Sequence, residues 1–332
     1  MTDPIPHPRE TYDWLGPEAP ERAFLDGLAR GRLHHAWLLA GPAGVGKATF
    51  AYRAARRLLG ARPDSARGLL GAAPEDPVSR RIEGRAHPDL LVLQRDPEDG
   101  KTRRNIPVEE ARALPEFFSK SPAASPYRVA IIDAADDLNA SSANALLKTM
   151  EEPPTRGVLF LVCQSPGALL ATIRSRGRRL NLPAPAADLS APWLARRLGV
   201  DADSAARLLA MSRSAPGGAW RLGVAGALET EAAATALLAA LPRGDAQAEQ
   251  ALAEGFRGPN GAARFQMVME RLADLARERI LARVGAGEGA RALDPWARVW
   301  QELTELPGRV EAVNLDRTEA FFVTLARLRA IA

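Results

Sequence analysis

Short apolar runs alternate with helix-like segments over the first half of the chain. The apolar runs predict buried strands at 37–40, 90–93, 129–133 and 158–162. Between these runs, apolar residues recur at three- and four-residue spacing, which predicts helices over 18–30, 47–59, 107–118 and 142–150. Strands that alternate with helices are typical of a parallel sheet covered by helices, so we expect an α/β domain.

The pattern changes after residue 182. Residues 183–192 are rich in proline and alanine, which predicts a linker because proline interrupts both helices and sheets. Beyond it, 193–224 and 229–332 carry apolar residues at helical spacing and almost no strand signal, so the second half should be helical. Residues 59–85 are rich in Gly, Pro, Arg and Ala and are expected to form a loop or a small excursion from the sheet.

Composition excludes several classes of protein. The 332 residues are 46% hydrophobic and 25% charged, which argues against disorder, coiled coil and collagen and allows two or three domains. A net charge of +4 on a chain of this size is no evidence of nucleic-acid binding. The single cysteine, Cys163, permits neither a disulfide framework nor a cysteine-based zinc site, which fits a reducing cytoplasm. The polar residues 1–10 and the shortness of the apolar runs predict no signal peptide and no membrane span.

A glycine-rich segment follows the first predicted strand and opens the next predicted helix. Its characteristic residues are Gly41, Gly44, Gly46, Lys47, Ala48 and Thr49. Glycines at this spacing let backbone N–H groups point at a phosphate, the helix N-terminus adds a favourable dipole, and the lysine adds a point charge. Only four of the 44 basic residues are lysines, which makes Lys47 more notable. We interpret the segment as a phosphate-binding loop; the alternative is a glycine-rich turn with a solvated lysine.

The residues that would hold a metal ion at this loop are incomplete. Ala48 occupies the position where a Ser or Thr hydroxyl binds magnesium, and Thr49 lies one place too late. Asp133 ends a predicted strand and suits a carboxylate that holds magnesium through water; the alternative is an acid that caps the strand end. Ala134 follows it, where an oligomeric ATPase has the glutamate that polarises the attacking water. The two losses argue against ATP hydrolysis.

Four segments resemble the bacterial clamp-loader family of AAA+ proteins. They are His-His-Ala-Trp-Leu-Leu at 34–39, His-Pro-Asp at 87–89, the segment 133–154 that ends in Glu-Glu-Pro-Pro, and Thr-Ile-Arg-Ser-Arg at 172–176. The alanine-rich start of 133–154 is similar to the δ′ branch of the family rather than to the ATP-hydrolysing γ/τ branch. The resemblance covers about residues 30–180. It implies an α/β P-loop (AAA+) parallel-sheet domain over 1–182, a small helical lid over 183–226 and an all-α collar for oligomerisation over 227–332.

Arg176 is the residue whose interpretation the resemblance changes most. Its neighbours include Arg174, Arg178 and Arg179. Residue chemistry alone favours a solvated surface cluster. Clamp loaders, however, carry a Ser-Arg-Cys motif whose arginine reaches ATP held by the neighbouring subunit, and Ser175-Arg176 matches it with Gly177 in place of the cysteine. Two parallel N–H donors of a guanidinium can meet two phosphate oxygens, so the resemblance implies that Arg176 is an arginine finger in trans.

The resemblance bears on two further residues and on zinc. The segment from Gly218 to Arg221 resembles the motif by which an arginine of the AAA+ lid reaches nucleotide phosphates; a solvated Arg221 is the alternative. We expect Lys148 to face a neighbouring subunit or the DNA channel, with plain solvation as the alternative. Many relatives carry four cysteines in the excursion, whereas 59–85 contains none, so we predict no zinc.

The resemblance implies a stator-like subunit without ATPase or polymerase activity of its own, within the DNA polymerase III holoenzyme. Its implied partners are the γ/τ and δ subunits, the sliding clamp and, through the complex, primer-template DNA, with no membrane. ATP or ADP is the implied ligand of the loop. The alternative is an active ATPase of the γ/τ or helicase-loader type, which needs Thr49 to replace the missing metal ligand and Asp136 or another acid to replace the missing glutamate. A small-molecule P-loop kinase is disfavoured because the helical second half serves no obvious substrate.

Overall fold

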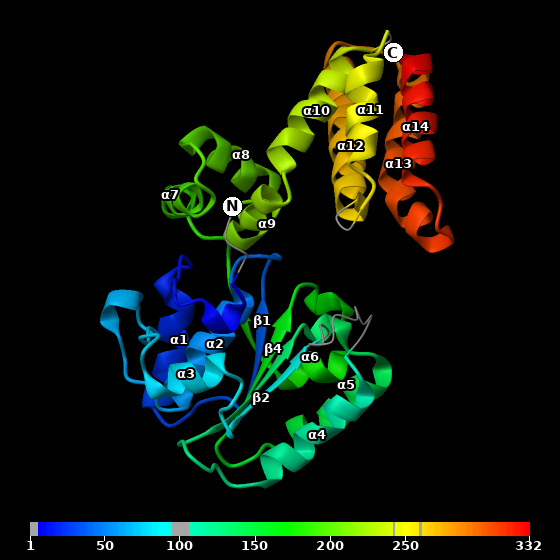
Figure 1. Cartoon of the computed structure of the whole chain (residues 1–332). Helices are drawn as coiled ribbons and strands as arrows, with labels where there is room; N and C mark the ends of the chain where they lie inside the picture. The colour runs from blue at the N-terminus through cyan, green and yellow to red at the C-terminus, as the bar shows by residue number, and fades with distance from the viewer. Residues whose placement is uncertain (1–5, 95–105, 242, 259–260) are drawn as a thin grey trace. The chain divides into compact units, whose positions relative to one another are not determined.

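The computed structural model describes residues 6–94, 106–241, 243–258 and 261–332. They belong to two compact units, residues 1–221 and 222–332, each of which is described by itself (Figure 1). The predicted finer division at residues 182 and 226 stays a prediction.

The first unit is built on a five-stranded sheet in which every neighbouring pair is parallel, in the order β2-β3-β4-β1-β5. The strands are β1 (Ala36–Ala40), β2 (Leu90–Gln94), β3 (Arg128–Asp133), β4 (Gly157–Cys163) and β5 (Arg178–Asn181). The predicted parallel α/β sheet is therefore confirmed. β5 is not predicted from the sequence, because this edge strand is mostly exposed and consists of Arg-Arg-Leu-Asn, with no apolar run.

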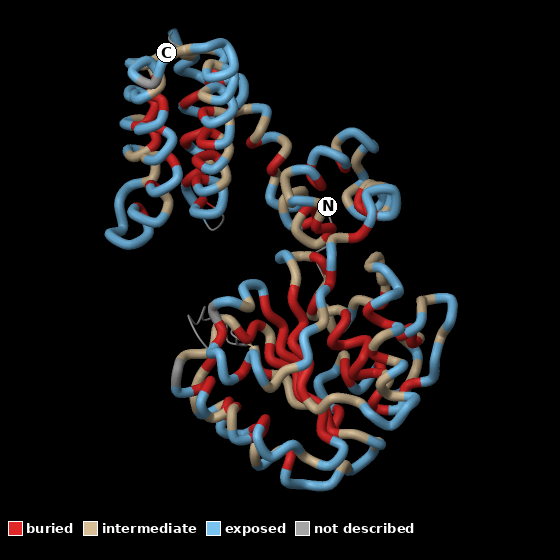
Figure 2. Tube along the Cα trace, turned by 180° about the vertical axis from the view of Figure 1, so that it is seen from behind, coloured by how far each residue is buried: buried red, intermediate tan, exposed pale blue. Residues whose placement is uncertain are grey.

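Helices cover both faces of this sheet, because successive side chains of a strand point to opposite sides. One face carries α1 (Glu18–Ala29), α2 (Lys47–Leu58) and α3 (Pro77–Glu83), and the other carries α4 (Val108–Ser119), α5 (Ala140–Glu151) and α6 (Ala171–Arg176). Trp37 of β1 packs in the first core, whereas the adjacent Leu38 packs in the second. Figure 2 shows the continuous buried stretches of the central strands between these layers.

Of the two alternatives predicted for residues 59–85, the structure shows the small excursion from the sheet rather than a plain loop. It contains a short 3-10 turn, η2 (Ser65–Arg67), and α3, which begins after an Asp76 cap. Arg53 of α2, 2% exposed, pairs with the fully buried Glu21 of α1 at 2.9 Å. The same guanidinium donates to the Arg67 carbonyl, and Glu21 accepts from the Leu69 N–H. A buried ion pair thus organises a segment that has no cysteines to bind zinc.

Three helices follow the sheet: α7 (Ala187–Leu198), α8 (Ala202–Met211) and α9 (Pro216–Val224). The predicted linker over 183–192 is therefore too long, because α7 begins at Ala187. Pro192 lies in the middle of α7, where a proline removes one helical hydrogen bond. The buried Leu194 holds the helix in place despite that loss.

The second unit is helical, as predicted. Its helices are α10 (Ala227–Ala239), α11 (Ala246–Glu254), α12 (Gly261–Gly285), α13 (Ala290–Val313) and α14 (Arg317–Ile331). Phe256 lies at its centre, with its ring edge-on to Phe265 of α12 at 5.3 Å and to Phe321 of α14 at 5.2 Å. Among the described residues, no single helix is both long and apolar enough to cross a membrane. The helices α9 and α10, which are joined by a bend, have that length and apolar character only when taken together.

Candidate nucleotide-binding site

The glycine-rich loop connects the buried end of β1 to the first residue of α2. Gly44 and Gly46 have φ values of 81° and 96°, in the left-handed region that side chains disfavour. Gly46 is the residue before α2, and its carbonyl accepts from the Phe50 N–H at 2.8 Å. The first free N–H groups of α2 therefore border the loop, as phosphate binding requires.

Lys47 is the first residue of α2, and its ammonium lies over the loop. Its Nζ donates to the carbonyls of Gly41 and Pro42, both at 2.7 Å, and the residue is 5% exposed. Burial lowers the pKa of Lys47 below its usual value of 10.5, while the nearby Asp133 opposes this shift. The loop thus holds a buried cation beside its own backbone.

Asp133 is the last residue of β3 and Asp136 follows shortly after it, but the two carboxylates have different surroundings. Asp133 ends the strand and lines the pocket described below. Both carboxylate oxygens of Asp136 are hydrogen-bonded to the end of β4: they accept from the backbone N–H groups of Gln164 at 2.7 Å and Ser165 at 2.9 Å. Asp136 also accepts from the Cys163 thiol, whose pKa burial raises to about 12. Asp136 therefore caps a strand end, which weakens the alternative in which it polarises a water molecule.

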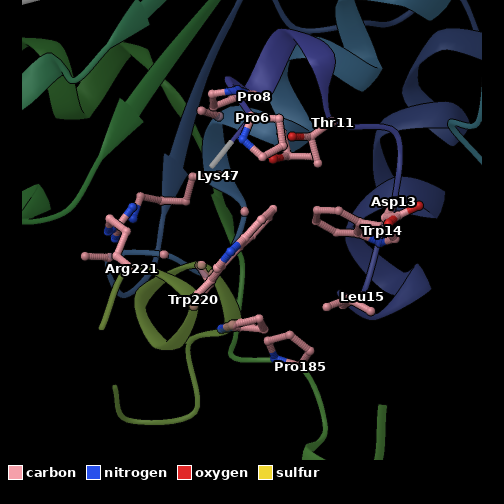
Figure 3. Close-up of a pocket in the computed structure, with 18 of the residues that line it drawn as sticks. Pro6, Pro8, Thr11, Asp13, Trp14, Leu15, Lys47, Pro185, Trp220 and Arg221 are labelled. Carbon is pink, nitrogen blue, oxygen red and sulfur yellow. The ribbon is translucent and has the colours of Figure 1, made fainter. Parts of the chain in front are cut away.

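A pocket of about 280 Å³ opens beside the loop (Figure 3). Its lining includes residues 43–49, Asp133, Gln164, Trp193, Trp220 and Arg221, together with residues of the N-terminal segment 6–15. The pocket thus gathers Gly44, Gly46, Lys47, Ala48, Thr49, Asp133 and Arg221 from the predicted site residues. Figure 3 places Arg221 on the same side as Lys47.

The other side of the pocket is aromatic. Trp14 packs beside Gly46 and contacts Phe50 at a ring distance of 5.8 Å, and its ring points toward Trp220 in Figure 3. Trp193 stands edge-on to Trp220 at 5.4 Å and donates to an Asp13 carboxylate oxygen at 3.2 Å. These three tryptophans could not be predicted as one group from the sequence, because they are far apart in the chain and only Trp220 lies in a motif-like segment, where Arg221 is the residue that the motif concerns.

The loop and α9 contact each other through backbone. The Gly217 N–H donates to the Gly44 carbonyl at 2.9 Å. A Cβ added to Gly44 would lie 2.3 Å from the Gly218 nitrogen, which leaves room for glycine only. This contact sets the distance between the loop and Arg221, one turn further along α9.

A magnesium ion, which P-loop folds of this type imply, does not fit these residues. Ala48 offers a methyl group where the metal ligand would be, and Asp136 is already engaged. Within the described ranges, no three His, Cys, Asp or Glu side chains come together as a metal site. The glycine loop, the two cations and the tryptophans do fit a nucleotide.

Arg176 is not among the described residues that line this pocket. It ends α6, just before β5, whereas the loop follows the end of β1; β1 and β5 run parallel with Trp37 opposite Arg178. Arg176 therefore lies at the amino edge of the sheet and the loop at the carboxyl edge. Its NH2 group pairs with Glu151 at 2.9 Å, and its NH1 group donates to the Thr172 carbonyl at 3.1 Å.

Lys148 lies on α5 with an exposed side chain and forms no ion pair within the part of the chain that the structure describes. Its predicted orientation toward a neighbour or a DNA channel stays a prediction.

The parallel sheet, the glycine loop at its carboxyl edge and the helices that follow define a P-loop module of the AAA+ type. A family model described as "DNA polymerase III, delta subunit" matches residues 17–186, about half of the chain. The chain belongs to this family of clamp-loader subunits.

Three curated relatives place the chain within the family. It is 38% identical to DNA polymerase III subunit delta′ of Pseudomonas aeruginosa over 60% of this chain and 58% of that protein. It is 31% identical to subunit delta′ of Escherichia coli over 64% of this chain and 60% of that protein. It is also 35% identical to DNA polymerase III subunit gamma of Buchnera aphidicola over 51% of this chain and 44% of that protein. The matches span about three fifths of the length of the delta′ relatives.

Proposed function

We propose that this chain is a stator-like δ′ subunit of a clamp loader that helps to load a sliding clamp onto primed DNA. It hydrolyses no ATP itself and presents Arg176 to the ATP site of a neighbouring γ/τ-type subunit. Its other partners are the δ subunit, the clamp and, through the complex, primer-template DNA. The observation that carries this proposal is the position of Arg176 at the sheet edge opposite its own phosphate loop.

That position favours action in trans. Arg176 ends α6, just before β5, and lies outside the pocket of its own chain, so its guanidinium serves phosphates that another chain brings to this edge. Three of its five N–H donors remain, because the Glu151 carboxylate and the Thr172 carbonyl take one each. A trans arginine stabilises the charge that develops on the γ-phosphate in the transition state.

The test is reconstitution with the ATPase subunits and δ of the same species. Arginine fingers contribute about 10³-fold or more at the site they serve, so Arg176→Ala should lower primed-DNA-stimulated ATP turnover while the complex still assembles. Arg179→Ala, which removes a nearby exposed arginine, is the matched control and should leave turnover unchanged. Equal turnover for wild type and Arg176→Ala would refute the assignment.

We also propose that the pocket binds ATP or ADP without a divalent cation. Lys47 and Arg221 supply the positive charge that a metal ion would otherwise supply, and the tryptophans offer a stacking surface for the base. Calorimetry with ADP should give similar affinities in EDTA and in magnesium, and Lys47→Ala should abolish the binding. Ala48→Thr restores the hydroxyl and should introduce a dependence on magnesium; no binding by the parent chain would refute this proposal.

The second candidate function is an active ATPase, which one observation favours: Thr49 lines the pocket. Steady-state turnover by the purified chain decides between the two. Turnover at the rate of an active AAA+ enzyme, lost in Thr49→Val, would favour the ATPase and refute the stator role.

A further inference from the structure

Glu151 is the acidic partner of Arg176 and has no place in the function proposed so far. It is the last residue of α5, and its carboxylate oxygen Oε1 lies 2.9 Å from the NH2 group of Arg176. The side chain of Arg176 is 37% exposed and that of Glu151 is 52% exposed, so the pair stands at the rim of the first unit. A neighbouring chain can therefore reach the arginine without disturbing the core.

The core fixes the backbone on both sides of this pair. Met150, next to Glu151, is 3% exposed, and Ile173 of α6 is 1% exposed; both belong to the core under this face of the sheet. A Cβ added to Gly177, next to Arg176, would lie 3.9 Å from the Met150 Cε atom. Because buried neighbours anchor both helix ends, the fold itself brings the carboxylate to the guanidinium. Figure 1 shows α5 and α6 side by side.

Two acceptors then fix the direction of the guanidinium. The Thr172 carbonyl accepts a hydrogen bond from NH1 at 3.1 Å. The Glu151 carboxylate, which is on a different helix, pairs with NH2. A free arginine side chain loses about 2 kcal/mol of rotamer entropy when it is fixed, and a phosphate contact is made more readily when that ordering is already present. The three remaining N–H donors are available to an incoming phosphate.

We propose that Glu151 is a positioning residue that holds the Arg176 guanidinium ready for the γ-phosphate of ATP bound to the neighbouring subunit. This inference rests on the proposed trans role of Arg176. Glu152 offers a matched control, because it is the next residue, carries the same charge, is exposed, and forms no side-chain ion pair among the described residues.

The experiment measures primed-DNA-stimulated ATP hydrolysis by the reconstituted complex, with kcat and the KM for ATP determined separately. The difference between wild type and Arg176→Ala defines the part of the turnover that depends on Arg176. Exposed ion pairs contribute modestly, so Glu151→Gln should lower that part about two- to fivefold, with assembly and thermal unfolding unchanged. Glu152→Gln should not lower it. In the Arg176→Ala background, Glu151→Gln should have no further effect, because the group on which it acts is gone.

Each outcome separates this inference from the function on which it rests. If Arg176→Ala itself changes nothing, the trans role fails, and the positioning role with it. If Arg176→Ala lowers turnover but Glu151→Gln behaves like Glu152→Gln, only the positioning role is refuted. If Glu151→Gln raises turnover, the carboxylate restrains the arginine away from the phosphate, which also overturns the proposal.

Discussion

The buried pair of Arg53 and Glu21 gives the sharpest prediction about stability. Glu21→Ala removes the carboxylate and leaves the guanidinium of Arg53, which is 2% exposed, with only the carbonyls of Tyr12 and Arg67 as acceptors. The variant also leaves the Leu69 N–H without the acceptor it uses in the parent chain. Removal of one partner from a buried ion pair costs about 3–5 kcal/mol, because the remaining charge cannot be solvated.

Thermal unfolding followed by circular dichroism, together with hydrogen exchange at Leu69, measures this effect. For a folded unit of this size, 3–5 kcal/mol corresponds to a Tm lower by roughly 6–20 °C. The Leu69 amide should exchange faster, since Glu21 accepts its hydrogen bond. Replacement of both partners by apolar residues, Glu21→Leu with Arg53→Met, should cost less than Glu21→Ala alone because no unpaired charge remains.

Glu18 on the same helix provides the control. It pairs with Arg22 at 2.8 Å, but both side chains are about two-thirds exposed, at 64% and 65%. Such pairs contribute at most about 1 kcal/mol, so Glu18→Ala should change the Tm little. If Glu21→Ala destabilises the chain no more than Glu18→Ala does, the buried pair is not what orders the excursion.

Three further predictions follow from single sites. Burial alone would raise the pKa of Asp89, but hydrogen bonds from residues 123–125 outweigh it and lower the pKa below 3.8. Its contribution to stability is therefore complete above about pH 5 and is lost as the pH falls through the folded pKa; acid unfolding of Asp89→Asn should be less steep. Gly44→Ala should weaken ADP binding in calorimetry, since its Cβ would lie 2.3 Å from the Gly218 nitrogen. Gly177→Ala should raise the free energy of unfolding in urea by about 0.4–1 kcal/mol, because its Cβ meets no atom closer than 3.5 Å.

The sequence predicts four of the five strands because each contains an apolar run. Val158 to Val162 are buried throughout, as expected for a strand covered on both faces, and Leu90 to Leu93 are apolar although the edge strand β2 is mostly half-buried. β5 escapes prediction because an exposed edge strand has no such run. The order of the excursion could not be predicted for a different reason. Glu21 and Arg53, whose ion pair organises it, are 32 residues apart, and no local sequence pattern indicates that they pair.

The candidate site likewise contains a part that the sequence predicts and a part that it does not. The phosphate half is local, since Gly41 to Thr49 form one loop and one helix start, and the spacing of their residue types predicts it. The aromatic half is assembled from three separate segments, by Trp14, Trp193 and Trp220, and only the folded chain brings them together. The role of Asp136 could not be predicted from the sequence. By residue type its carboxylate is a candidate for the acid that polarises water, but in the structure it accepts hydrogen bonds from the backbone at the end of β4.

The polarity of the sheet links the two halves of the proposed function. In a parallel sheet, every strand ends at the same edge, so the loop after β1 and the arginine before β5 lie at opposite edges. The five residues of β1 separate these edges by roughly 13–17 Å at about 3.3 Å per residue. An arginine side chain, which reaches about 7 Å, does not span that distance to its own loop. In the function we propose, the phosphates bound by this chain therefore lie at one edge of the sheet, and Arg176 at the opposite edge is presented to phosphates that a second chain holds.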